Sequence, residues 1–225
     1  MSSISPDTLT FLSDLKENNN RPWFEINKPR YEAARANFVD FIAELQAKLL
    51  EIEPIVQKDP KKFPYRIYRD VRFSKNKDPY KLNISALIER APNFKKMPMY
   101  IHIQPGNNSF LAGGAWEPEK EQLKAIRSEI DYNGDKLVKI LAGKPFKTHF
   151  KISEADKLKT VPKGYNADNP HIEFLKLKQF IISKPFTDEE ITAPDFADRI
   201  IEAYKAALGF LAFFDEAVAN PEAED

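Results

Sequence analysis

The spacing of apolar residues changes along the chain, and this change constrains the fold more than any other feature. Between residues 31 and 49, large apolar side chains recur at the three- and four-residue spacing of one helical face. From residue 65 to residue 116 the spacing falls to two, the period of a strand with one buried face. Helices followed by strands predict an α+β fold rather than the regular strand and helix alternation of a parallel sheet.

Two helices are expected in the first third of the chain. The first begins at a Ser5 cap and ends at the asparagines of 18–20. Asn27 is expected to cap a longer second helix, which Pro54 ends. The aromatic pair at 23–24 falls in the link between the two helices, where large rings are expected to pack one helix on the other.

The rest of the chain supplies the predicted sheet and more helices. Strands are expected over residues 65–73, 82–88, 99–104, 109–116, 146–152 and 177–183. Helices are expected over residues 118–130 and 136–141, and after a Thr192 cap. We therefore predict a single α+β domain over residues 1–225. Its mainly antiparallel sheet is packed by N-terminal and C-terminal helices, and its tail is frayed after about residue 220.

Composition excludes several kinds of chemistry. The chain contains no cysteine, which excludes disulfides, thiolate metal ligands and a cysteine nucleophile. The three histidines, His102, His149 and His171, lack the spacing of zinc sites, so no metal and no cofactor are expected. The N-terminus does not resemble a signal peptide and no apolar run reaches about 20 residues, which favours a cytoplasmic protein without membrane contact.

Charge is concentrated in residues 61–81, although the chain as a whole has zero formal net charge. This segment carries eight Lys or Arg and two Asp, a sum of +6, whereas residues 186–225 carry eleven acidic and two basic residues, a sum of −9. A local basic patch is sufficient for a small anionic ligand. Nucleic acid is possible but not favoured, since overall neutrality argues against binding to a duplex.

Residues 65–73 alternate aromatic and cationic side chains, a combination that suits an anionic and planar ligand. On a strand, Arg69 would lie on the apolar face, with Arg66 and Arg72 on the opposite face. Guanidinium groups bind phosphate or carboxylate bidentately, so this segment is the candidate ligand site. Its expected ligand-binding residues are Arg66, Tyr68, Arg69, Asp70, Arg72, Ser74, Lys75, Tyr80 and Lys81.

Three functions are compatible with this segment. The first is a protein that binds a phosphate-bearing or otherwise anionic ligand. The second is an enzyme acting on a phosphorylated or nucleotide substrate at the same site, with Asp70 or His102 moving protons; His102 shares a predicted strand face with Tyr100 and Gln104. In the third, the arginines form ion pairs with acids such as those of the terminal helix, and the protein is structural or an interaction protein.

The oligomeric state stays open between a monomer and a homodimer. Residues 208–214 of the terminal helix are apolar beyond one helical stripe. Such a helix is either buried on two sides within one chain or in contact with a second copy.

Four stretches of the chain combine charged and aromatic residues in a fixed order. They are LKENNNRPWFEINKPRYE, YRIYRDVRFSKNKDPYK, FLAGGAWEPEKEQLKAIRSEI and VPKGYNADNP. Together they resemble an uncharacterised bacterial family, domain of unknown function 2461, over most of the chain. The resemblance implies a single α+β domain of about this length and transfers no catalytic residue. Where that family tends to read Asp-His-Pro, this chain has Asp168-Asn169-Pro170, which weakens a catalytic role for a histidine there.

Overall fold

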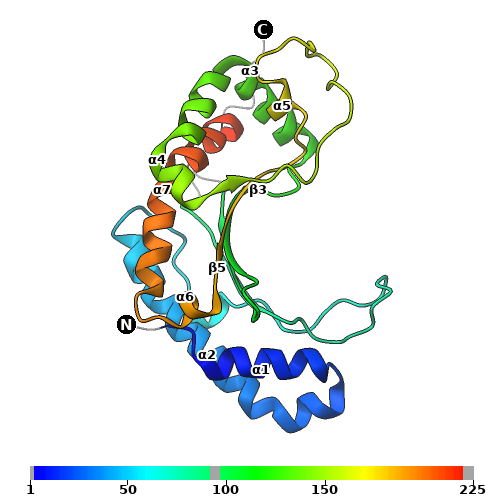
Figure 1. The fold of residues 1–225 in the computed structure, drawn as a ribbon, viewed down its shortest axis with the longest axis vertical. Helices are drawn as coiled ribbons and strands as arrows, with labels where there is room; N and C mark the ends of the chain where they lie inside the picture. Colours follow the sequence, from blue (N-terminus) through cyan, green and yellow to red (C-terminus); the bar gives the residue numbers. More distant parts are fainter. Residues whose placement is uncertain (1–2, 92–96, 220–225) are drawn as a thin grey trace. The chain divides into compact units, whose positions relative to one another are not determined.

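A computed structural model describes residues 3–91 and 97–219 (Figure 1). The described chain folds into two units, each built from segments that are distant in sequence. The first unit comprises the described residues of Met1–Ile88, Tyr100–Leu111 and Pro185–Ile201. The second comprises those of Glu89–Met99, Ala112–Lys184 and Glu202–Asp225. The boundary falls within strands and a helix instead of in a linker.

The secondary structure confirms the predicted α+β class. The helices are α1 (Pro6–Glu17), α2 (Arg21–Leu50), the 3-10 helix η1 (Pro60–Lys62), α3 (Lys120–Ala142), α4 (Lys144–His149), α5 (Ile172–Leu175), α6 (Asp188–Thr192) and α7 (Phe196–Ala219). The strands are β1 (Ile84–Ile88), β2 (Met99–Ile103), β3 (Ser109–Ala115), β4 (Lys151–Ile152) and β5 (Phe180–Phe186). They form an antiparallel sheet in the order β1-β2-β3-β5-β4, which confirms the predicted antiparallel sheet.

Helices α1 and α2 form a helical hairpin in the first unit (Figure 1). The Ser5 hydroxyl accepts a hydrogen bond from the Asp7 N–H at 3.2 Å and caps α1, as predicted. Phe11 of α1 stacks on Trp23 of α2 with ring centroids 6.1 Å apart, and Phe24 is fully buried. The aromatic pair at the start of α2 therefore packs the two helices together, which confirms its predicted role.

Helix α2 begins earlier than predicted. The Asn20 side chain accepts a hydrogen bond from the Trp23 N–H at 3.0 Å, and this bond caps the helix before Arg21. Pro22 then occupies the first turn, where the N–H that proline lacks would have no partner within the helix. The predicted cap at Asn27 is therefore wrong, and the expected link is the first turn of the helix.

Residues 65–73 do not form the regular strand that their alternation predicts. Two isolated antiparallel bridges hold this part of the chain, one between Pro64 and Ala86 and one between Tyr68 and Tyr80. Proline has no N–H with which to continue a ladder, and a proline stands at the start of each paired stretch: Pro64 before residue 65 and Pro79 before Tyr80. Beyond the second bridge the chain projects as an irregular loop, drawn in turquoise in Figure 1.

Several predicted elements after residue 116 also differ. The two helices expected over residues 118–130 and 136–141 are both present as the two parts of α3, and the non-helical residue Asn133 separates them; only their ends differ from the prediction. Most of the strand expected at 146–152 is the helix α4, because the Gly-Lys-Pro sequence before it favours a helix start. The strand expected at 177–183 is β5, which begins and ends three residues later.

The terminal helix is not capped by Thr192, which is the last residue of α6. A capping box starts α6 instead: the Thr187 hydroxyl accepts from the Glu190 N–H at 3.1 Å, and the Glu190 carboxylate accepts from the Thr187 N–H at 2.8 Å. The separate helix α7 follows. This Thr-x-x-Glu pattern is visible in the sequence and was the stronger helix-start signal.

Helix α7 covers its apolar surface within one chain. In the second unit, the side chains of Phe210, Leu211, Phe213 and Phe214 are all fully buried. The predicted frayed tail after about residue 220 lies outside the described residues. No helix in the described chain combines the length and the hydrophobicity needed to cross a bilayer.

The side chain of Asn19 ties the irregular segment to the helical hairpin. Its amide donates to the Tyr80 carbonyl at 3.0 Å and accepts from the Tyr80 N–H at 3.1 Å. The Tyr80 ring stacks on Phe24 with centroids 4.0 Å apart and is 2% exposed. Tyr80 is thus a fixed point from which the chain continues through Lys81 into β1.

We expect Asn19→Ala to lower the free energy of unfolding by about 1–3 kcal/mol, because it leaves two partly buried backbone groups without partners. Asn18→Ala is the matched control, since the Asn18 side chain donates to the Asp14 carbonyl of its own helix at 2.9 Å. Urea unfolding measures both variants. An equal loss of stability in the two would contradict the anchoring role of Asn19.

Candidate functional site

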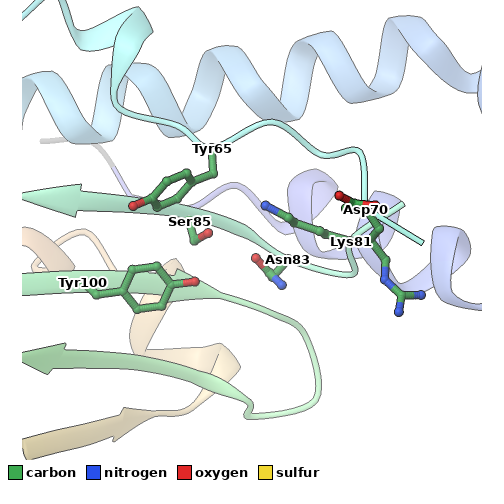
Figure 2. A pocket seen from close by; sticks show the side chains of 7 residues that line it. Tyr65, Asp70, Lys81, Asn83, Ser85 and Tyr100 are labelled. Atoms are coloured by element: carbon green, nitrogen blue, oxygen red, sulfur yellow. The ribbon is translucent and has the colours of Figure 1, made fainter. Parts of the chain in front are cut away.

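An open pocket of about 490 Å³ lies in the first unit, between the irregular segment and the strands β1 and β2 (Figure 2). It is lined by Tyr65, Arg69, Asp70, Lys81, Asn83, Ser85 and Tyr100. Backbone hydrogen bonds fix its sides: the Tyr65 N–H donates to the Ser85 carbonyl at 2.9 Å, and the Lys81 N–H donates to the Ile67 carbonyl at 2.7 Å. Figure 2 shows Lys81 reaching from the side of Asp70 toward Tyr65.

The structure brings some of the predicted ligand-binding residues into this pocket. Arg69, Asp70 and Lys81 are among its lining residues. Arg66, Arg72 and Lys75 are exposed and do not belong to the lining.

The remaining predicted residues do not line the pocket and instead pack or hold the segment beside it. Tyr80 lies in the core, as described above. Tyr68 is 52% exposed, and its ring lies against Phe24 with centroids 6.3 Å apart. Ser74 is half-buried in the loop, where its N–H donates to the Val71 carbonyl at 3.3 Å. These three residues therefore shape the segment around the pocket.

Within the described residues, Arg69 forms no ion pair with a carboxylate. Its Nη1 donates to the Asp78 carbonyl at 3.1 Å. Arg72 takes the nearby acid: its guanidinium holds both oxygens of Asp70, at 2.9 and 2.6 Å, and these hydrogen bonds lower the pKa of Asp70. Because Arg72 neutralises Asp70, the uncompensated charge of the pocket lining belongs to Arg69 and Lys81.

Lys81 carries its charge in unfavourable surroundings. Burial, followed by the nearby positive charge of Arg66, lowers the pKa of Lys81 from the ordinary 10.5. Its ammonium lies 5.4 Å from the centroid of the Tyr65 ring. No carboxylate within residues 3–91 and 97–219 forms an ion pair with it. An anion in the pocket would therefore meet positive charge that the protein does not neutralise.

A chain of hydrogen bonds leads from the pocket along β2, on the strand face predicted for these residues. His102 Nε2 lies 3.0 Å from the side-chain amide oxygen Oε1 of Gln104; because this oxygen can only accept, the proton is on Nε2. Nδ1 then accepts from the Tyr100 hydroxyl at 3.2 Å, and the Tyr100 oxygen bonds in turn to the Ser85 hydroxyl. Burial lowers the pKa of His102 and raises the pKa of Tyr100, so both side chains are neutral at about pH 7.

Asn83, Ser85 and Tyr100 were not among the predicted site residues. Asn83 and Ser85 follow Lys81 at a spacing of two in an otherwise apolar stretch, and this alternation was the available signal. The Asn83 Oδ1 atom is buried and has no hydrogen-bond partner among the residues that the structure describes. Tyr100 could be added only once β2 was known to lie beside β1.

The other two histidines belong to the second unit. His171 Nε2 lies 3.4 Å from Asp135 Oδ1, and burial lowers the pKa of His149. No group of three or more His, Asp or Glu side chains that would hold a metal ion occurs in the described parts of the chain.

A family model described as a conserved hypothetical protein (DUF2461) matches residues 7–213. The chain belongs to this family. No curated protein and no solved structure matches it. The family description assigns no activity, so the function of this DUF2461 chain has to be argued from the pocket itself.

We expect Lys81→Met to raise the midpoint of thermal unfolding. The lowered pKa means that the folded state holds this charge less favourably than the unfolded chain does. The cost is fully present below the folded-state pKa and disappears as the pH rises past 10.5. The gain should therefore be larger at about pH 7 than at about pH 10. Lys62→Met, at an exposed lysine, is the control; a lower midpoint for Lys81→Met alone would contradict the assignment.

Proposed function

We propose that the pocket binds a small anionic ligand that carries a phosphate group. The position of Lys81 supports this most: its half-buried ammonium lies near the charge of Arg66, its pKa is lowered, and no acid of the described residues pairs with it. Groups whose pKa is shifted by burial and neighbouring charge cluster at functional sites, because a ligand of opposite charge removes the cost.

The lining suits a ligand with an anionic end and a less polar remainder. Arg69 offers a guanidinium fork for phosphate oxygens, and Lys81 adds a mobile point charge. The Tyr65 and Tyr100 rings form the aromatic part of the lining, with centroids 6.4 Å apart and planes tilted by 47°. Because the two rings are already in contact, a planar ligand group would lie against one ring and not between the two. A volume of about 490 Å³ fits a small molecule.

An ion-pair network is the weaker explanation for the basic segment. The pair between Arg72 and Asp70 is exposed, with 76% and 47% of the two side chains accessible. Exposed pairs contribute about 0–1 kcal/mol to stability. Acids of the terminal region pair with cations outside the basic segment; Asp198 of α7, for example, pairs with Lys48 at 2.7 Å. The exposed Asp70 pair gives little reason to concentrate so much positive charge.

A phosphorylated metabolite as ligand also favours a cytoplasmic location, since most such compounds are made and consumed there.

Binding can be measured by thermal shift and calorimetry against inorganic phosphate, nucleoside monophosphates and sugar phosphates. We expect Lys81→Met to weaken binding of a responding ligand by about 2 kcal/mol, roughly thirtyfold in Kd, because it removes a charged partner. Arg69→Met should have a similar effect, and Lys62→Met none. A wild-type protein that responds to no anion, or a Lys81→Met variant that binds equally well, would sink the proposal.

An enzymatic function at the same site is a second candidate, favoured by the hydrogen bonds from Ser85 through Tyr100 to His102. Tyr100 would take a proton from a substrate hydroxyl or a water while passing its own proton to His102 Nδ1, so that the imidazole carries the charge. His102 would thus act through Tyr100 as the final proton acceptor. Asp70 is a poor base, because its pairing with Arg72 lowers its pKa.

Hydrolysis of aryl phosphate monoesters and diesters tests this candidate. If the pocket is catalytic, we expect Tyr100→Phe to reduce turnover by about a hundredfold or more, because proton transfer contributes at least that much. Lys62→Met, at an exposed lysine outside the pocket lining, should leave turnover nearly unchanged and serves as the control. Absence of turnover by the wild type, or an undiminished rate in Tyr100→Phe, would remove the enzymatic candidate and leave the binding function.

A further inference from the structure

Exposed rings are concentrated in residues 65–77, which we call the aromatic–basic segment. In the described chain, seven large apolar or aromatic side chains are exposed, and three of them, Tyr65, Tyr68 and Phe73, belong to this segment. Phe73 is 95% exposed. Water contact with so many rings in a short segment is unfavourable, and such a concentration marks a surface that meets a partner.

The loop that carries Phe73 is held together by its own hydrogen bonds. Lys77 Nζ donates to the Val71 carbonyl at 2.9 Å, and the Asp78 N–H donates to the Asn76 side chain at 2.7 Å. The Arg72 pair with Asp70 adds a further link. Phe73 is thus held outward by a built turn, with the Arg72 guanidinium 5.8 Å from its ring centroid.

Cations alternate with these rings along the segment. Arg66, Arg72 and Lys75 are exposed. Arg66 and Lys75 form no ion pair with a carboxylate in the part of the chain that the structure describes. A surface with this composition offers ring faces and positive charges in turn.

We propose that the aromatic–basic segment binds single-stranded nucleic acid. Bases would stack on Phe73 and on the exposed faces of Tyr65 and Tyr68, and the phosphates between them would meet the unpaired cations Arg66 and Lys75. Base stacking on aromatic side chains, combined with cations that follow the phosphates, is how proteins hold single strands without reading sequence. The exposed cations give charge complementarity to the polymer.

A single strand fits better than a duplex or a bilayer. A duplex hides its base faces, so the exposed rings would gain nothing, and a neutral protein lacks the broad positive surface that duplex phosphates require. A bilayer favours a continuous apolar face with cations at its border. Here Arg72 lies over the Phe73 ring, and the two other exposed rings are tyrosines, which carry polar hydroxyl groups. The segment therefore lacks the continuous apolar face that a bilayer favours.

Binding of a polymer extends the proposed function, which concerns a small anion. It rests on that function in one respect: one phosphate of the strand would bind in the pocket. Phe73 and Lys75 do not line the pocket. Their variants therefore report on the polymer, whereas Lys81→Met reports on the pocket, and the two proposals can fail separately.

Fluorescence anisotropy with labelled oligo(dT) and oligo(U) of about 15 nucleotides, over a range of salt concentrations, tests the inference. We expect Phe73→Ala to weaken binding about five- to a hundredfold with an unchanged salt slope, and Phe73→Trp to restore it. Lys75→Gln should weaken binding and reduce the slope by about 0.7, the value for one phosphate contact on a single strand. The exposed position of Phe73 keeps these variants folded.

Three results would overturn the inference. They are the absence of binding to either oligonucleotide, equal affinity of Phe73→Ala and the wild type, and binding to a duplex of the same sequence that is as tight as binding to the single strand. Vesicles of phosphatidylserine and phosphatidylcholine serve as the comparison surface. Binding to these vesicles that is lost in Phe73→Ala, without binding to oligonucleotides, would assign the segment to membranes instead.

Discussion

The paired hydrogen bonds between the Asn19 amide and the backbone of Tyr80 are the contact on which the pocket depends. They satisfy both the backbone N–H and the backbone carbonyl of Tyr80, which a neighbouring strand would satisfy in a regular sheet. With its backbone held and its ring stacked on Phe24, Tyr80 fixes the start of the stretch that carries Lys81. The helical hairpin thereby positions a charged side chain that it does not itself contain.

Electrostatics and packing act against each other in this unit. The Tyr80 and Phe24 rings bury apolar surface and favour folding. The next residue in the chain after Tyr80 is Lys81, whose ammonium is partly buried and close to the positive charge of Arg66. Both effects disfavour folding. Proteins often keep such locally unfavourable arrangements at functional sites and offset them elsewhere. The secure anchoring of Tyr80 is what lets the chain hold Lys81 there.

The sequence was sufficient to predict an element where a local signal decides its structure. It was insufficient where a side chain distant in sequence decides it. Ser5 caps α1 by a bond to its own next turn, and β1 to β3 follow from alternation alone. Residues 65–73 have the same alternation, yet only two isolated bridges form there, and the Asn19 amide binds the backbone groups of Tyr80.

The site shows the same division. Charge and spacing pointed to Arg69, Asp70 and Lys81, which line the pocket. Tyr80 had the same local appearance as a ligand-binding tyrosine, and only its stacking on Phe24 places it in the core. Tyr100 enters the lining because β2 lies beside β1, a pairing of strands that no single stretch of sequence encodes.

Apart from Tyr100, every residue that lines the pocket lies between positions 65 and 85. A site confined to so short a stretch needs only a small loop to close, and the chain entropy lost in closing it is low. The pocket is thus nearly local in sequence, and it can assemble early, as soon as the helical hairpin provides Asn19 and Phe24. Substitutions within this one short stretch can also alter the lining during evolution, and they leave the core of the second unit unchanged.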